Sequence, residues 1–318
     1  MDWIMVTGGA GFIGSHLVGS LLQKGKKILC LDNFDDFYDP SVKRENIKDF
    51  INNQNFSLFQ VDIRQKEKLN EIFTSFKIET VVHLAAKAGV RPSILNPGIY
   101  TSVNVDGTET LLEKCTEYNI KKFIFGSSSS VYGNNRKIPF SESDPVENPI
   151  SPYAATKRAG ELLCYTFFHL YRMPVVVMRF FTVYGPRQRP EMAIHKFTRL
   201  MLDGEPIPVY GDGKTSRDYT YIDDIVNGVE RAVELDCGYE IINLGNSKVV
   251  QLIELIKIIE RCLGVRSKIR WLPEQPGDVK RTYADIAKAV KLLGYAPETP
   301  ISQGIERFVD WYKNALLD

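Results

Sequence analysis

The sequence predicts an α/β protein with a doubly wound parallel sheet, followed by a smaller C-terminal α/β domain that covers the substrate. Strand-like apolar runs alternate with helical patterns up to about residue 180, which is typical of a parallel sheet with helices on both faces. Beyond that point prolines and glycines divide the chain into short pieces, as in loop-rich regions that bind ligands. We therefore expect domains at 1–178 and 179–318, with some chain crossing back.

A glycine-rich turn follows the first predicted strand, residues 3–6, and precedes a helix. Glycines at this spacing let the backbone approach a pyrophosphate, which the helix N-terminus attracts. The spacing alone is a weak signal, because any turn that needs positive φ also uses glycine. The candidate coenzyme contacts in this turn are Gly8, Gly11, Phe12, Ile13 and Gly14.

The second predicted strand, residues 27–31, ends on Asp32. A carboxylate at that strand end is placed to accept both ribose hydroxyls and to repel a 2′-phosphate. Strand, glycines, helix, strand and acid in this order predict a Rossmann site for NAD rather than NADP.

Three further strands are expected at 56–61, 80–84 and 122–125, separated by helices at 66–76 and 105–118. Ligands of such sheets bind outside the carboxyl ends of the strands. Alanines at these ends would leave room for a coenzyme, although they would suit ordinary close packing equally well. Further candidate coenzyme contacts near these ends are Asn33, Asp62, Ile63, Leu84, Ala85, Ala86 and Ser127.

The second half of the chain shows four clear elements. We expect a helix at 224–234 opened by an aspartate cap, a strand at 239–244, and helices at 250–263 and 285–293.

Composition argues against several classes of protein. Forty basic and 39 acidic residues leave a net charge of +1, so nothing favours nucleic acid or an anionic membrane as a partner. No apolar run approaches the roughly 18 residues that a membrane span requires, and no secretory signal opens the chain. Five scattered cysteines and four histidines lack disulfide or metal-ligand spacing, so we expect no metal site. The sequence predicts a soluble, cytoplasmic protein.

Tyr153 and Lys157 stand four residues apart, after a Ser151–Pro152 pair that suits a helix start. A neighbouring ammonium and a cationic nicotinamide ring should lower the pKa of the phenol from about 10. Tyr153 could then accept a proton from a sugar hydroxyl while hydride leaves the same carbon. Tyr-x-x-x-Lys is common on helix surfaces, and its position after a nucleotide-binding fold is what makes it a catalytic candidate.

Five segments, in order over essentially the whole chain, resemble the extended short-chain dehydrogenase/reductases, and more narrowly the nucleotide-sugar 4-epimerases: residues 7–14, 83–86, 127–133, 151–157 and 217–224. The resemblance implies that Ser128 is the catalytic serine beside Tyr153 and Lys157. It also implies coenzyme-site roles for Asn104, thought to hold a water near the lysine, and for Phe180. A side-chain bond that bends the helix is the alternative for Asn104.

The residues after the catalytic serine bear on the reaction type. Dehydratases of this family carry an Asp-Glu pair there, whereas this chain has Ser129 and Ser130. Hydroxyl groups cannot perform that acid–base chemistry at neutral pH, so dehydration is disfavoured.

The segment 179–193 is closely similar to that of the UDP-glucuronate 4-epimerases. A carboxylate at C6 requires a guanidinium and several donors, and Arg189, Thr182, Ser129 and Ser130 would supply them. Arg189 could instead lie on a solvent loop or bind a phosphate.

Other candidates come from the resemblance. Arg217 matches an arginine that contacts the UDP pyrophosphate, with an ion pair to Asp218 or Asp223 as the alternative, and Asp278 matches a residue over the uridine ribose. Thr282 stands where many hexose epimerases carry tyrosine, so an N-acetyl sugar remains open. The candidate substrate contacts are Arg91, Ser128, Ser129, Ser130, Thr182, Arg189, Arg217 and Asp278.

We therefore expect NAD-dependent C4 epimerisation of a UDP-sugar, UDP-glucuronate to UDP-galacturonate, through a transient 4-keto intermediate. UDP-glucose or UDP-N-acetylglucosamine epimerisation is the close alternative. A net oxidoreductase or lyase, and a non-catalytic NAD-binding regulator, are alternatives from other classes. Relatives dimerise through paired helices, and the apolar content of 101–118 and 153–171 predicts a homodimer with a four-helix bundle.

Overall fold

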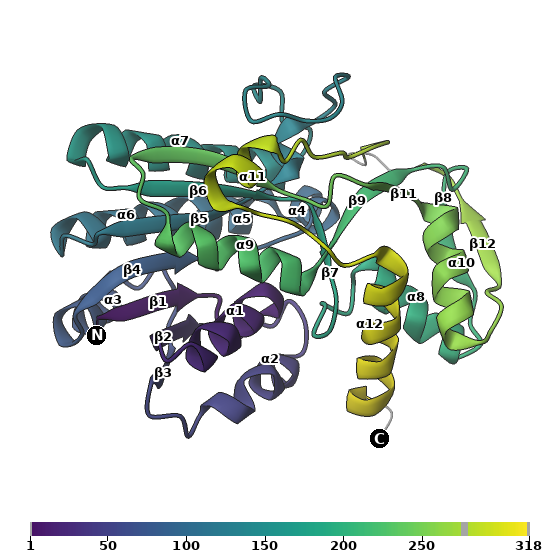
Figure 1. Ribbon diagram of the computed structural model, residues 1–318, viewed down its shortest axis with the longest axis horizontal. Coiled ribbons are helices and arrows are strands. Elements are labelled where there is room, and N and C mark those ends of the chain that lie inside the picture. The colour runs from purple at the N-terminus through teal and green to yellow at the C-terminus, as the bar shows by residue number, and fades with distance from the viewer. Residues whose placement is uncertain (1, 275–278, 317–318) are drawn as a thin grey trace.

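The structure is a computed structural model that describes residues 2–274 and 279–316. Its main sheet has seven strands in the order β3-β2-β1-β4-β5-β6-β10, and all neighbouring strands are parallel (Figure 1). The order reverses beside β1, which places a crevice between the ends of β1 and β4. The strands are β1 (Trp3–Thr7), β2 (Lys27–Asp32), β3 (Phe56–Gln60), β4 (Ile78–His83), β5 (Lys122–Ser128), β6 (Val175–Phe180) and β10 (Tyr239–Leu244).

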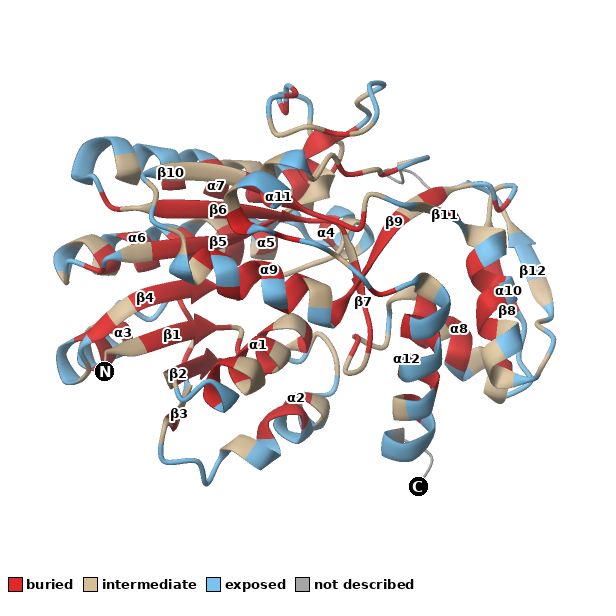
Figure 2. Ribbon diagram, in the orientation of Figure 1, coloured by how far each residue is buried: buried red, intermediate tan, exposed pale blue. Residues whose placement is uncertain are grey.

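Helices cover both faces of this sheet, which confirms the predicted doubly wound fold. Successive strand residues point to opposite faces, so Val6 and Ile28 belong to one buried cluster and Met5 and Leu29 to the other. The first cluster includes α1 (Phe12–Gln23), α9 (Ile222–Glu234) and α11 (Ala287–Leu293); the second includes α3 (Lys66–Ser75), α6 (Gly107–Glu117) and α7 (Pro152–Tyr171). Figure 2 shows the sheet as the buried centre of the molecule.

Short helical segments connect these elements near the carboxyl ends of the strands. They are α2 (Pro40–Ile47), a 3₁₀ turn at Lys48–Phe50, α4 (Val90–Leu95), α5 (Pro97–Thr101), a π-helical turn at Ser102–Asp106 and a 3₁₀ turn at Ser129–Tyr132.

A smaller region lies beside the main sheet (Figure 1). It contains a three-stranded sheet, a parallel strand pair and three helices. The sheet consists of β11 (Val249–Gln251), β9 (Ser216–Tyr221) and β7 (Thr182–Tyr184), and the pair of β12 (Ile269–Leu272) and β8 (Ile207–Tyr210). The helices are α8 (Ala193–Leu202), α10 (Leu252–Leu263) and α12 (Ile301–Leu316). The boundary between 1–178 and 179–318 stays a prediction, although α9 and β10 do cross back to the main sheet.

Several element boundaries differ from the sequence-based expectation. Helix α9 begins at Ile222, and the carboxylate of Asp224 does not cap it but accepts hydrogen bonds from the backbone of Glu298 and Thr299. Residues 249–251 form a strand because β9 offers them an antiparallel partner, and α10 begins only afterwards. Helix α11 begins at Ala287, two residues later than expected.

The helices proposed for dimerisation differ in their surfaces. Helix α7 exposes four large apolar or aromatic side chains: Leu162, Tyr165, Leu170 and Tyr171. In 101–118 the apolar side chains are buried or half-buried, and the exposed positions are polar: Thr101, Asp106, Glu109, Glu113 and Glu117. The expected apolar excess is therefore wrong for 101–118 and confirmed for α7.

Across the described ranges, every helix is too short or too polar to cross a membrane.

Candidate active site

The glycine-rich turn packs tightly against the chain's own backbone. Gly8 has a φ of +67°, and a Cβ there would lie 2.8 Å from the backbone nitrogen of Ala85. A Cβ on Gly14 would lie 2.2 Å from the carbonyl oxygen of Gly8. Helix α1 begins at Phe12, so its first N–H groups face the same space. The turn therefore has no room for side chains at Gly8 and Gly14, and its role as a pyrophosphate site stays a prediction.

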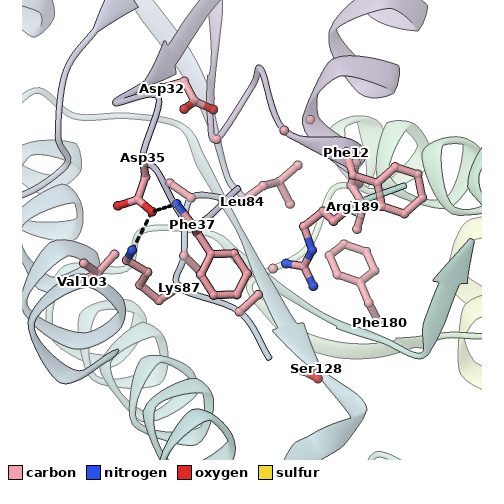
Figure 3. A pocket seen from close by; sticks show the side chains of 18 of the residues that line it. Phe12, Asp32, Asp35, Phe37, Leu84, Lys87, Val103, Ser128, Phe180 and Arg189 are labelled. Carbon is pink, nitrogen blue, oxygen red and sulfur yellow. Dashed lines mark hydrogen bonds and ion pairs between the residues drawn. The ribbon is translucent and has the colours of Figure 1, made fainter. Parts of the chain in front are cut away.

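A cavity of about 360 Å³ lies outside the carboxyl ends of the main strands, in front of this turn (Figure 3). It brings together most of the residues predicted from the sequence. Those that line it are Gly8, Gly11, Phe12, Ile13, Gly14, Asp32, Asn33, Asp62, Ile63, Leu84, Ala85, Ala86, Ser127, Ser128, Ser129, Ser130, Tyr153, Lys157, Phe180, Thr182 and Arg189. Asn104, Arg91 and Arg217 are not part of its lining.

The carboxylate of Asp32 is buried at the end of β2. It accepts hydrogen bonds from the backbone N–H groups of Ala10 (3.2 Å) and Phe34 (2.8 Å). The ammonium of Lys43, also buried, lies 3.5 Å from it. These contacts fix the carboxylate at the cavity wall, and its predicted role in binding the NAD ribose stays a prediction. Sequence reasoning missed Lys43, which lies 11 positions beyond Asp32 and forms no recognisable motif with it.

Asp62 lies at the neighbouring strand end. The guanidinium of Arg64 donates two hydrogen bonds of 2.8 Å to it, and the amide of Asn33 donates a third of 3.0 Å. These bonds, those from Arg64 first, hold the pKa of Asp62 at about 2. Asp62 is therefore ionised at neutral pH, and its assignment as a coenzyme contact stays a prediction.

An ion pair spans two strand ends across the cavity wall. The ammonium of Lys87, after β4, lies 2.6 Å from the carboxylate of Asp35, after β2 (Figure 3). Asp35 also accepts a hydrogen bond of 3.0 Å from the backbone of Phe37. The pair was not predicted, because its residues are 52 positions apart and no local pattern joins them.

Asn104 lies in the π-helical turn and is buried. Its amide accepts from the backbone N–H of Lys87 and donates to the Lys87 carbonyl and to the hydroxyl of Thr156. These bonds connect the segment after β4 to α7, so the side chain positions other residues of the site. Its assignment as a coenzyme contact stays a prediction.

Tyr153, Lys157 and Ser128 meet at the end of β5. Tyr153 shares a hydrogen bond with Ser128, and Lys157 donates one of 2.7 Å to the carbonyl of Gly126. Burial lowers the pKa of Lys157 to about 8. Burial also raises the pKa of Tyr153, against the opposing effects of Ser128 and Arg189. The expectation that cations lower the pKa of Tyr153 is therefore wrong for the chain alone, because desolvation outweighs them.

A network of buried charged side chains centred on Glu161 lies one helical turn from Lys157. Glu161, one turn after Lys157 in α7, is fully buried and receives two hydrogen bonds of 2.8 Å from Arg179 of β6. Ser127 donates a further bond of 2.6 Å to Glu161. Arg179 also donates to the hydroxyl of Tyr132 at 3.0 Å. The network ties α7 to the sheet, and the predicted coenzyme contact Ser127 thus also has a structural bond.

Arg189 projects from the loop between β7 and α8, and Figure 3 shows its guanidinium pointing into the cavity. Its charge acts to lower the pKa values of Tyr38, Tyr100 and Tyr153, although burial raises all three. It pairs with Glu191 at 2.9 Å. Arg189 is therefore not on a solvent loop, which was one of the alternatives.

Ser128 and Ser130 also form a pair at the cavity wall. Ser128 donates to the hydroxyl of Ser130 at 3.1 Å and accepts from its backbone N–H at 3.2 Å. Several hydroxyl groups thus lie at the same wall as Arg189.

The remaining substrate candidates lie beyond this cavity. The guanidinium of Arg91 stacks on the ring of Tyr210 in β8 at 4.7 Å, and Arg217 donates to the carbonyl of Ser216. Thr282 is buried, and its hydroxyl accepts from the backbone of Asp218. Asp278 lies outside the described residues.

The two acids proposed as alternative partners of Arg217 have contacts of their own. Asp218 accepts from three backbone N–H groups, those of Asn246, Ser247 and Ala284. Asp223 pairs with Arg307 at 3.9 Å.

Comparison with known proteins identifies the relatives of this chain. A UDP-glucuronate 4-epimerase from Thermodesulfobacterium geofontis is 44% identical over 314 residues, which cover 98% of this chain and 97% of that protein. The crystal structure of a Bacillus cereus UDP-glucuronic acid 4-epimerase in complex with UDP-glucuronic acid and NAD matches with a TM-score of 0.92 and 38% identity, over 98% of this chain and 99% of that one.

A UDP-glucose 4-epimerase from Thermotoga maritima with UDP-glucose gives a TM-score of 0.91 and 34% identity, over 99% of both chains. The fold alone thus does not separate the two sugars. Residues 5–308 match the family described as GDP-mannose 4,6 dehydratase. The chain therefore belongs to that family of extended short-chain dehydrogenase/reductases.

Proposed function

We propose that this chain is an NAD-dependent UDP-sugar 4-epimerase that converts UDP-glucuronate to UDP-galacturonate. The observation that carries the choice of sugar is the guanidinium of Arg189, which points into the cavity that Tyr153 also lines. A guanidinium holds a carboxylate through two parallel hydrogen bonds, whereas a hydroxymethyl group does not need its charge. Relatives named for this activity at 44% and 38% identity support the same choice.

NAD, when bound, accepts a hydride from C4 of the sugar and later returns it. The chain's part is to hold and orient the coenzyme. The glycine-rich turn and the N-terminus of α1 would hold the pyrophosphate, and Asp32 with Lys43 would bind a ribose. A carboxylate at this position disfavours a 2′-phosphate.

Tyr153 is assigned as the base and then the acid at O4 of the sugar. It takes the O4 proton as the C4–H bond breaks and the C4 ketone forms. After the flat 4-keto sugar turns about its pyrophosphate linkage, Tyr153 returns the proton to O4 as the C4–H bond forms on the opposite face. Each atom lost in the first half is regained in the second, so the net change is inversion at C4.

The neighbours of Tyr153 make this proton transfer possible. Burial keeps the phenol protonated in the chain alone, so nearby positive charge has to stabilise the phenolate as it forms. Lys157 is held on the carbonyl of Gly126 and Arg189 faces the cavity. Ser128, which favours the ionised form of Tyr153, would orient the phenol toward the sugar.

The same arginine also bears on a side reaction. A ketone at C4 makes the sugar a β-keto acid, because the C6 carboxylate is bonded to the neighbouring carbon C5. Such an acid loses CO2 when its C5–C6 bond aligns with the π system of the C4 carbonyl. Arg189, with Ser130 and Thr182, would hold the carboxylate out of that alignment. Epimerisation then completes without decarboxylation.

The described acids of the cavity argue against elimination of water, despite the dehydratase in the family description. The carboxylates among the described lining residues are Asp32, Asp35 and Asp62. Each lies at or just after the end of β2 or β3 and has the partners given above, away from Ser128 at the end of β5. Ser129 and Ser130 occupy the positions where an acid–base pair would be needed.

The test is to incubate the NAD-loaded protein separately with UDP-glucuronate, UDP-glucose and UDP-N-acetylglucosamine, and to follow the anomeric proton by NMR. We expect UDP-galacturonate from the first at an equilibrium near unity. Fast conversion of UDP-glucose without conversion of UDP-glucuronate would overturn the choice of sugar. Stoichiometric NADH or CO2 would indicate an oxidoreductase or a lyase. Activity that survives Tyr153→Phe unchanged would contradict the mechanism.

We also propose a homodimer, supported by the four exposed side chains of α7: Leu162, Tyr165, Leu170 and Tyr171. Exposed apolar side chains of this kind are typical of an interface. Light scattering of the native protein and of Leu170→Glu tests this proposal, and we expect a dimer for the first and a monomer for the second. A cytoplasmic location is proposed because all five cysteines are free.

A further inference from the structure

The loop of residues 185–192, called here the Arg189 loop, joins β7 to α8 and carries the arginine that the proposed function assigns to the uronate. How well this arginine can bind the uronate carboxylate depends on where its backbone is held. A displacement of about 1 Å in a group that positions a substrate can cost roughly 100-fold in rate. The contacts that hold the loop therefore matter to the choice of sugar.

The Arg189 loop is not held by regular structure of its own. Its internal backbone bonds are those from Gln188 to the Gly185 carbonyl and from Met192 to the Arg189 carbonyl. Arg187 has a φ of +61°, in the left-handed region that a non-glycine residue occupies at a cost. Contacts from outside the loop have to maintain this conformation.

One such contact comes from the helix of the glycine-rich turn. Nε2 of His16 in α1 lies 3.0 Å from the carbonyl oxygen of Pro186, which is 170 positions away in the sequence. Because a carbonyl oxygen only accepts, the ring donates its Nε2–H. Burial lowers the pKa of His16 to about 4, so the ring is neutral at pH 7. Figure 1 shows the segment between β7 and α8 beside the start of α1.

Two further contacts support the loop: the guanidinium of Arg187 lies 5.9 Å from the ring centroid of Phe50, and Gln188 forms hydrogen bonds. The side chain of Gln188 is buried; its amide donates to the Val183 carbonyl at 3.2 Å and accepts from the His195 N–H at 3.2 Å. Gln188 thus ties the loop to β7 and α8 in its own region. His16, by contrast, ties it to the coenzyme-binding sheet.

We propose that His16 is a positioning residue for Arg189. Through His16, helix α1, whose N-terminus would bind the coenzyme, also fixes the position of the Arg189 guanidinium in the cavity. The proposal rests on the proposed function. It assigns sugar discrimination to a residue that does not line the cavity and contacts the loop three residues before Arg189.

The experiment measures the affinity of the full chain, loaded with NAD, for UDP-glucuronate and for UDP-glucose. A Tyr153→Phe background slows turnover in every sample. We expect His16→Phe to weaken the binding of UDP-glucuronate by about 3- to 10-fold, which is the effect of losing one hydrogen bond. The binding of UDP-glucose should not change. His16→Gln keeps a donor N–H and should restore the affinity. If His16→Phe does not fold, His16→Ala carries the same test.

Two controls separate positioning from general damage. Adding Arg189→Ala should abolish the effect of His16→Phe, because there is then no guanidinium to misplace. Ser20→Ala removes a bond of 2.6 Å between the same helix and Glu230 of α9, and it should leave the ratio of the two affinities unchanged. Equal weakening of both sugars, or an effect that persists without Arg189, would show a merely structural role and overturn the proposal.

The two proposals can fail separately. If Arg189→Ala leaves the preference for UDP-glucuronate intact, the carboxylate assignment of the proposed function is wrong and this inference falls with it. If Arg189→Ala removes the preference while His16→Phe does not change it, only the role of His16 is wrong.

Discussion

The coenzyme half of the cavity is formed largely by backbone, whereas the sugar half is formed by side chains. The coenzyme half consists of the glycine-rich turn with Asp32 and Asp62, whose acids are held by N–H groups and by Arg64. The sugar half consists of Ser128, Ser130, Tyr153, Thr182 and Arg189, carried by β5, the 3₁₀ turn after it, α7, β7 and the Arg189 loop. If the proposed function holds, the difference teaches that one half binds a coenzyme that is the same for every substrate, while the other can change its ligand through single substitutions.

In the coenzyme half, the largest loss of NAD binding should follow the addition of one methyl group. In Gly14→Ala the new Cβ would lie 2.2 Å from the Gly8 carbonyl, so the turn must move. We expect NAD binding, measured by calorimetry, to fall below detection. Gly98→Ala is the matched control, because a Cβ at Gly98 meets no atom within 4 Å. Tight NAD binding by Gly14→Ala would show that the turn is not the pyrophosphate site.

In the sugar half the largest effect should follow the loss of one hydroxyl. Tyr153→Phe removes the proton acceptor, and kcat should fall by about 10²- to 10⁴-fold, the usual contribution of a general base. NAD affinity should stay close to that of the native protein, because the backbone of the coenzyme half is untouched. Anomeric-proton NMR at high enzyme concentration measures the residual rate. A loss of less than about 10-fold would point to another base.

Lys157→Met should separate catalysis from stability. We expect kcat to fall by about 100-fold, while the free energy of unfolding at pH 7 does not fall. The pKa of Lys157 is about 8 in the folded chain and near 10.5 when unfolded. Between these values the unfolded state binds more protons, so this lysine adds stability as the pH rises.

The measurement compares urea unfolding of the native protein and Lys157→Met at pH 7 and pH 10. As the pH rises, the free energy of unfolding of the native protein should increase relative to that of the variant, by up to about 3 kcal/mol. The lost hydrogen bond to the Gly126 carbonyl offsets part of the variant's advantage at pH 7. A difference between the two proteins that does not depend on pH would contradict the lowered pKa.

The smallest effect should come from a single side chain in the coenzyme half. Lys87→Met breaks the pair with Asp35, which is partly exposed to solvent, so NAD affinity should weaken by only about 2- to 5-fold. Raising the salt concentration should reduce that loss, because the pair is then screened in the native protein as well. A loss of 100-fold would mean that side chains matter as much here as in the sugar half.

The parts of the site that follow from local sequence were predictable. Glycine spacing, an acid at a strand end and a tyrosine one helical turn from a lysine are each set by short-range geometry, so Gly14, Asp32 and Tyr153 line one cavity as expected. Parallel strands meet at a common edge, which is why residues from different strand ends also met.

The missed contacts join residues that are far apart in the sequence. Asp35 and Lys87, Glu161 and Arg179, and His16 and Pro186 face one another only after the sheet has assembled. The pKa of Tyr153 was misjudged for a related reason. A sequence shows which charges are near a phenol, but not how deeply the fold buries it.

The return of the chain to the main sheet has a consequence for synthesis on the ribosome. Strand β10 pairs with β6, and α9 packs against α1, yet both lie after residue 220. A nascent chain of 178 residues would expose the edge of β6 and the apolar side chains that α9 covers, including Val176 and Met178. Such surfaces aggregate. The main sheet is therefore completed late in synthesis. Protection by a chaperone should matter most while residues 180–244 emerge from the ribosome.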